Sequence, residues 1–199
     1  WQLDQISLIL QFENHTGNMI TASVKKRENI AEYLLYMWQI EDIIRAYGLD
    51  SDRIQSEIID RYSGLSDTQK KEMREWYESL IDMMRREDAE KSGHIQLNKN
   101  VIIALDDLHR RLMASPKYAA YNAEFYKTLP YIVEIRAKAG ENKADEIETC
   151  FNALYGLMLL RLQRKEVSPE TEAAAKQISK FLAMLAAYYK QDFNNELEL

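Results

Sequence analysis

The segment from Asn29 to Tyr47 constrains the fold most, because apolar side chains lie on nearly every side of the helix that it predicts. Residues 33–38 read YLLYMW, six apolar or aromatic residues in a row. A helix that is apolar all round is either buried in a protein core or inserted in a membrane. The run is far shorter than the roughly 20 apolar residues that a membrane span requires. We therefore expect a buried core helix, which ends at Gly48 in a left-handed turn.

The rest of the chain predicts further helices. Apolar residues recur at three- and four-residue spacing, and the few glycines and prolines lie mostly between these segments. Short connections make consecutive helices antiparallel neighbours. The prediction is an all-α fold: a single-domain bundle of six to seven mostly antiparallel helices around the buried central helix. Pro130 lies inside one of them, and we expect it to kink or split that helix.

The first 18 residues differ from the rest. Residues 1–18 begin with Trp and end in turn-forming residues, and Met19 is followed by a plausible start of the domain. Two interpretations stay open. Residues 1–18 are an upstream extension, or they form a short amphipathic element that packs loosely on the domain. In both cases residues 19–199 are the single helical domain.

Charge and cysteine content indicate the compartment and exclude some partners. The net charge of −6 argues against a general surface for nucleic acid or for anionic membranes. Cys150 is the only cysteine, so an internal disulfide is excluded and a reducing compartment is compatible. No basic segment precedes an apolar one as in a signal peptide. We expect a cytoplasmic protein with no nucleic-acid partner and no membrane partner.

Motifs for catalysis, cofactors or metals are weak. The sequence has no glycine-rich phosphate loop, no HExxH and no GxSxG. Asp106 and His109 have the i,i+3 spacing of di-iron bundles, but the pair occurs once, and we interpret His109 as a boundary histidine. His94 follows Gly93 and would cap a helix or be solvated. Cys150 reads as a buried structural thiol. We expect no catalytic residue, no cofactor and no metal ion.

One polar set in the central helix is the candidate site. Its members, which would line a pocket or form a buried polar network, are Glu32, Trp38, Gln39, Glu41, Asp42 and Arg45. Glu41 and Arg45 are spaced as an i,i+4 ion pair. Buried charges are costly unless they are paired, and such networks often mark sites. The alternative is that the helix exposes one edge and that these residues form it.

The segment 25–50, KKRENIAEYLLYMWQIEDIIRAYGLD, resembles the start of a family of all-helical proteins from Bacteroides-type bacteria, catalogued as a domain of unknown function. The resemblance extends from about Met19 to the C-terminal helix. It implies an α-helical cytoplasmic protein of about this length, starting near Met19. It implies no activity and supplies no functional residues.

These observations favour a non-enzymatic cytoplasmic helical module for interaction or scaffolding, with a homodimer as one possible form. The reason is that the sequence lacks catalytic motifs and is rich in aromatic residues and methionine. An alternative is a small-molecule-binding helical bundle, with a pocket beside the central helix and the Pro130 kink. A third class is an enzyme that uses buried acids of the central helix.

Overall fold

The computed structural model describes residues 22, 25–138 and 144–197. Throughout these residues the regular structure is helical and contains no strand, which confirms the predicted all-α class. The predictions for residues 1–18 lie outside the described part of the chain. Among the described helices, none has the length and hydropathy needed to cross a membrane.

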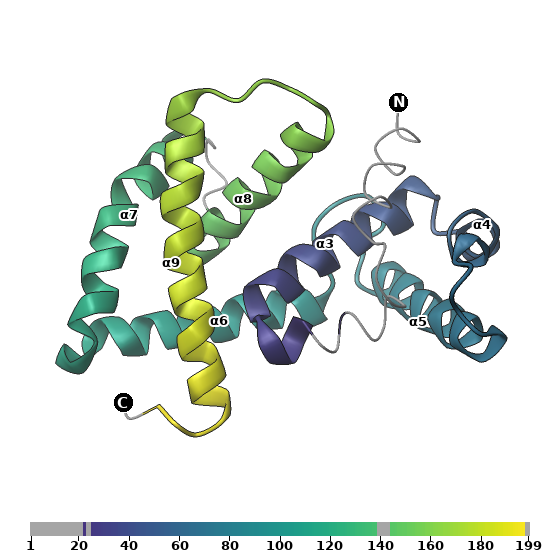
Figure 1. Ribbon diagram of the computed structural model, residues 1–199, viewed down its shortest axis with the longest axis horizontal. Coiled ribbons are helices and arrows are strands. Elements are labelled where there is room, and N and C mark those ends of the chain that lie inside the picture. Colours follow the sequence, from purple (N-terminus) through teal and green to yellow (C-terminus); the bar gives the residue numbers. More distant parts are fainter. Residues whose placement is uncertain (1–21, 23–24, 139–143, 198–199) are drawn as a thin grey trace. The chain divides into compact units, whose positions relative to one another are not determined.

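The helices follow one another with short connections (Figure 1). In chain order the elements are α3 (Ile30–Ala46), α4 (Ser51–Glu57), η1 (Ile59–Arg61), α5 (Asp67–Arg86), α6 (Gln96–Ala114), η2 (Pro116–Tyr118), α7 (Ala119–Lys138), α8 (Glu146–Leu162) and α9 (Pro169–Phe193). Within the described residues, the α-helices from α3 to α9 match the upper end of the predicted six to seven, and residues 25–28 are helical as well. The chain divides into two compact units: Glu32–Lys99 form most of the first, and Asn100–Leu199 form most of the second.

In the first unit, α3 is the apolar helix that the sequence predicts. Leu34, Ile40 and Ile43 are completely buried. The helix ends at Gly48, whose φ of +67° is the left-handed conformation that glycine adopts at little cost. The Gly48 N–H donates to the carbonyl of Arg45 at 3.0 Å and so satisfies a carbonyl of the last turn. Both the buried helix and its glycine stop are confirmed.

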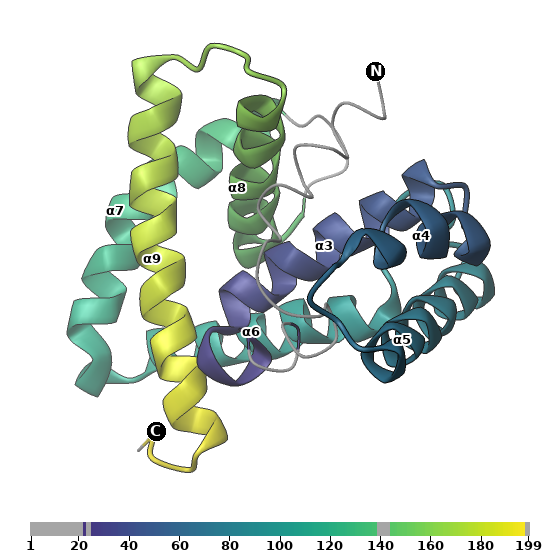
Figure 2. The same cartoon turned by 45° about the vertical axis from the view of Figure 1, so that its right-hand side comes forward.

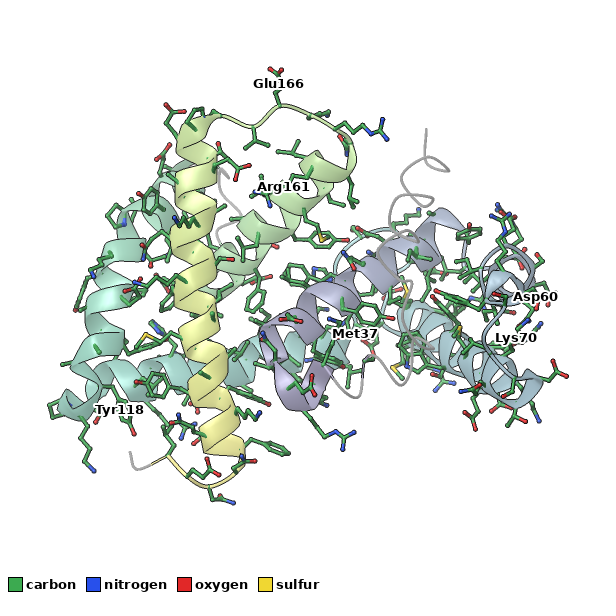
Figure 3. The ribbon with its side chains drawn as sticks, in the orientation of Figure 1. Met37, Asp60, Lys70, Tyr118, Arg161 and Glu166 are labelled. Carbon is green, nitrogen blue, oxygen red and sulfur yellow. The ribbon has the colours of Figure 1, made fainter. Side chains whose placement is uncertain are left out.

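The helices α4 and α5 complete the first unit, and side-chain caps define where they begin. The carboxylate of Asp50 accepts the N–H groups of Asp52 and Arg53 at 3.0 and 3.1 Å at the start of α4. Ser66 and Gln69 form a reciprocal capping box at the start of α5. The buried face of α5 consists of Met73, Tyr77, Leu80, Ile81 and Met84. At the solvent side, the Lys70 ammonium donates to the Asp60 carbonyl at 3.3 Å, and Figure 3 shows the two residues close together.

In the second unit, α7, α8 and α9 pack against one another, and α9 lies between the other two in both views (Figures 1 and 2). The core face of α9 consists of Ile178, Phe181, Leu182, Leu185 and Ala186. Arg111 of α6 pairs with Asp192 of α9 at 2.5 Å. At the opposite end of α9, Arg161 of α8 pairs with Glu172 at 2.5 Å.

Pro130 lies inside α7, and the helix continues through it from Ala119 to Lys138. A split at this proline, one of the two predicted outcomes, is therefore wrong. Pro130 lies on the exposed side of the helix. The carbonyl of Tyr126, which loses its usual N–H partner to the proline, belongs to a residue that is itself exposed to water. The cost of the missing hydrogen bond is low because water can replace it.

Candidate functional site

Glu41 is the most deeply buried charged residue of the predicted polar set, with 1% of its surface exposed. Its Oε1 accepts hydrogen bonds from the Ile95 backbone N–H at 2.9 Å and from Asn98 Nδ2 at 2.8 Å. Its Oε2 lies 2.5 Å from His94 Nδ1. Three donors therefore converge on one carboxylate, which offsets the cost of removing it from water.

The position of these donors explains why a carboxylate lies there. Ile95 immediately precedes α6, and the first N–H groups of a helix have no intrahelical acceptor. A carboxylate at this end accepts such an N–H and interacts favourably with the positive end of the helix dipole. Glu41 belongs to α3, so it caps α6 from another helix. The contact fixes the segment before α6 against α3.

His94 lies between Glu41 and an aromatic surface. Its imidazole stacks on Trp38, with ring centroids 4.1 Å apart and planes inclined by 10°. A carboxylate bound to Nδ1 directs Nε2 of the ring away from it, and His94 retains 24% side-chain exposure. An imidazole oriented in this way is the arrangement found in general bases and in metal ligands. Among the described residues, no three His, Cys, Asp or Glu side chains lie close enough together to hold a metal ion.

Arg45 holds the loop between α5 and α6. Its Nε and Nη2 donate to the carbonyl of Ala89 at 3.2 and 3.0 Å, and Nη2 also donates to the carbonyl of Gly93. Its Nη1 donates to Asp42 at 2.7 Å. The expected pair of Glu41 with Arg45 is therefore wrong, and Arg45 pairs with Asp42 instead. The planar guanidinium can serve the two loop carbonyls and a carboxylate together, whereas Glu41 is occupied by its own three donors.

Of the other members of the set, Trp38 is buried and the rest lie nearer to solvent. Glu32 is exposed and pairs with Lys25 at 3.2 Å, while Gln39 is half-buried. Trp38 is 2% exposed. Glu41 thus fits the predicted buried network, and Glu32 fits the alternative of an exposed helix edge. Any role of these residues in binding or catalysis stays a prediction.

Sequence reasoning missed the partners of Glu41 and Arg45. They are Ala89, Gly93, His94, Ile95 and Asn98, all in or beside the loop from α5 to α6. Two of these partners act through backbone carbonyls and one through a backbone N–H, which no residue type reveals. His94 was the one available signal, because a histidine beside a helix start can meet a carboxylate from another element.

In the second unit, Asp106 and His109 do not form a common site. Asp106 pairs with Arg110, one turn along α6. His109 Nδ1 lies 2.7 Å from the Tyr121 hydroxyl, and its ring contacts those of Phe125 and Phe181. The expectation of a boundary histidine is wrong: His109 is only 7% exposed. Burial lowers the pKa of His109, because the charged imidazolium is poorly solvated among these rings.

Cys150 lies in the core of the second unit. Its thiol is free and its residue is completely buried. Burial, together with the smaller effect of the neighbouring Glu146 carboxylate, raises the pKa of the Cys150 thiol to about 12. A thiolate is the reactive form of cysteine, so this residue is inert at neutral pH. The prediction of a buried structural thiol is confirmed.

Helix α7 carries a second apolar face, opposite the one that is buried. Its inner face is buried through Tyr121, Phe125 and Ile132. Its outer face is an exposed row of apolar residues, here named the outer stripe: Ala119, Ala123, Tyr126, Pro130, Val133 and Ala137. Tyr126 and Val133 are 62% and 58% exposed. The spacing alternates between four and three residues, as in the contact seam of a coiled coil.

Comparison of the chain with models of known protein families identifies a family to which it is similar. A family model described as a domain of unknown function (DUF4924) matches residues 19–196. No curated protein and no solved structure matches the chain. The matched residues include every helix from α3 to α9. They also include the segment 25–50 that carried the resemblance, and the chain therefore belongs to the family of this domain of unknown function.

Proposed function

We propose that this chain is a non-enzymatic, cytoplasmic interaction module that pairs with a second copy of itself through the outer stripe of α7. The observation that carries the proposal is the exposure of an apolar seam at coiled-coil spacing, opposite a face that is already buried. Exposed apolar patches rimmed by polar residues commonly mark protein–protein contacts. Lys127 and Glu134 form such a polar rim along one edge of the stripe.

The sequence of the stripe favours a second copy as its partner. Pro130 stands at its centre, with Ala123 and Ala137 seven residues away on either side. The large side chains of Tyr126 and Val133 lie between the centre and these alanines. The order of small and large side chains is therefore similar in both directions from Pro130. Such a row can pack against a second copy of itself, as the two-fold interface of a homodimer requires.

The size of the stripe predicts a weak dimer. A helix of 20 residues is about 30 Å long, and one helix face is roughly 10 Å wide. The area that two such faces bury lies at or below the lower limit of stable interfaces. We therefore expect association in the micromolar range, with monomer and dimer in exchange. The inert thiol of Cys150 is compatible with the reducing cytoplasm.

Light scattering on size-exclusion fractions tests this proposal. The average mass of the wild-type chain should rise from 23.4 kDa towards twice that value over about 10 to 300 µM. Val133→Glu places a charge in the seam and should keep the chain monomeric. Ile103→Glu is the matched control, because Ile103 is 60% exposed on α6 and lies outside the stripe.

Both variants change an exposed side chain, so their helix content, measured by circular dichroism, should equal that of the wild type. A wild-type mass of 23.4 kDa over the whole range contradicts the proposal. Equal association of the wild type and Val133→Glu contradicts it as well.

A further inference from the structure

We infer that the two copies of α7 run antiparallel, with Pro130 beside the two-fold axis, and that Lys127 of each copy pairs with Glu134 of the other. This inference rests on the proposed self-association and adds its orientation and the residues that specify it. Lys127 follows Tyr126 and Glu134 follows Val133, so both charges lie along the same edge of the outer stripe. Their side chains are 65% and 63% exposed and can reach across a seam.

Antiparallel pairing brings these two charges together. When two helices cross antiparallel at Pro130, residues at equal distances before and after it face each other. Lys127 lies three residues before Pro130 and Glu134 lies four residues after it. In antiparallel coiled coils, residues on the same edge of the seam are neighbours, so Lys127 of each copy meets Glu134 of the other and the pair occurs twice in one dimer.

Parallel pairing gives no such match. In a parallel dimer, the edge with Lys127 and Glu134 would face the other edge of the partner's outer stripe. That other edge consists of Asn122, Leu129 and Arg136. Lys127 would face the Asn122 amide, and Glu134 would face the apolar Leu129. The charges of the outer stripe therefore distinguish the two orientations.

Lys127 and Glu134 already form ion pairs within one copy, but breaking these pairs costs little stability. Lys127 lies 3.8 Å from Glu124, and Glu134 lies 2.7 Å from Lys138. Lys138 and Glu134 are largely exposed, and exposed pairs contribute little to stability. Glu124 is buried, but it keeps its hydrogen bonds from Gln177 and Lys180, both at 2.8 Å, when Lys127 changes partner. Exchanging such partners for equivalent ones across an interface costs little.

Charge reversal with mass measurement tests the inference. Lys127→Glu and Glu134→Lys each place like charges in both pairs of the dimer, and each should raise the dissociation constant about 3- to 30-fold. The double variant restores opposite charges and should associate within about twofold of the wild type. Lys71→Glu is the control, because Lys71 forms a comparably exposed pair with Glu75 on α5 and should leave association unchanged.

Each outcome has a definite meaning. Association that is equal in the wild type, both single variants and the double variant overturns the antiparallel pairing and leaves the proposed self-association intact. Failure of the double variant to recover overturns the pairing too. A wild type that stays monomeric overturns the proposed function and this inference together.

Discussion

The carboxylate of Glu41 and the imidazole of His94 lie 2.5 Å apart, from Oε2 to Nδ1, although 53 residues separate them in the chain. The same imidazole stacks on Trp38, one turn before Glu41 on α3. The helix α3 thus supplies both a hydrogen-bond acceptor and an aromatic surface for His94, two residues before the start of α6. This arrangement explains how a buried acid is tolerated in an apolar helix.

Replacing Glu41 should destabilise the fold strongly. Glu41→Ala leaves the Ile95 N–H and the Asn98 amide buried without their acceptor, and we expect a loss of about 2 to 4 kcal/mol of unfolding free energy. Urea denaturation measures this loss. Glu32→Ala, an exposed change on the same helix, is the control and should cost under about 0.5 kcal/mol. Equal effects of the two substitutions would show that the hydrogen bonds of Glu41 add nothing.

Arg45→Lys should loosen the loop from α5 to α6. A lysine ammonium cannot serve the carbonyls of Ala89 and Gly93 and the Asp42 carboxylate with the geometry of a guanidinium. We expect a loss of about 1 to 2 kcal/mol and faster hydrogen exchange in residues 87–95. Arg53→Lys is the control, because Arg53 pairs with Glu57 on the surface of α4. Unchanged exchange in the loop would contradict the role assigned to Arg45.

His109 should make stability depend on pH. Burial lowers its pKa in the folded state below the value of about 6.5 in the unfolded chain, so the unfolded chain binds more protons between these two values. The stabilisation is present above about pH 6.5 and is lost as the pH falls towards the folded pKa. Unfolding free energy should therefore decrease from pH 7.5 to 5.5 in the wild type. The decrease should be smaller in His109→Gln, and an equal decrease would contradict the assignment.

Cys150 should resist thiol reagents in the folded protein. Its residue is fully buried and its pKa is raised to about 12, so thiolate is scarce and inaccessible at pH 7.5. We expect a chromogenic disulfide reagent to react only when the chain unfolds, at a rate that rises with urea concentration. Rapid stoichiometric reaction in buffer would contradict the burial of this thiol.

The sequence predicted the helices well, because local chemistry determines them. Five of the six residues in the apolar run 33–38 are buried, and Gly48 provides the left-handed stop that its position requires. The partners of Glu41 could not be predicted, because a backbone N–H gives no signal in the sequence and His94 lies 53 residues away. The i,i+4 spacing predicted Arg45 as the partner of Glu41. In the structure Glu41 instead binds His94, the Ile95 N–H and Asn98, at or near the start of α6.

The outer stripe shows a second limit of sequence analysis. Periodicity identifies Tyr121, Phe125 and Ile132 as one apolar face of α7, and these residues are buried. Tyr126 and Val133 have the same helical spacing and are exposed. Periodicity thus predicted the buried face correctly, but it does not show whether a second apolar face is covered by another element, which depends on the packing of α7 on α8 and α9.

Disulfide trapping on α7 tests the central claim most directly. Ala123→Cys and Ala137→Cys each place one new thiol on the outer stripe, seven residues before and seven residues after Pro130, and the buried Cys150 stays unreactive. An equimolar mixture of the two variants should form a covalent dimer on mild oxidation that links position 123 of one copy to position 137 of the other. Each variant alone should form few covalent dimers. Efficient linkage of each variant to itself, or no linkage in the mixture, would contradict antiparallel pairing through α7.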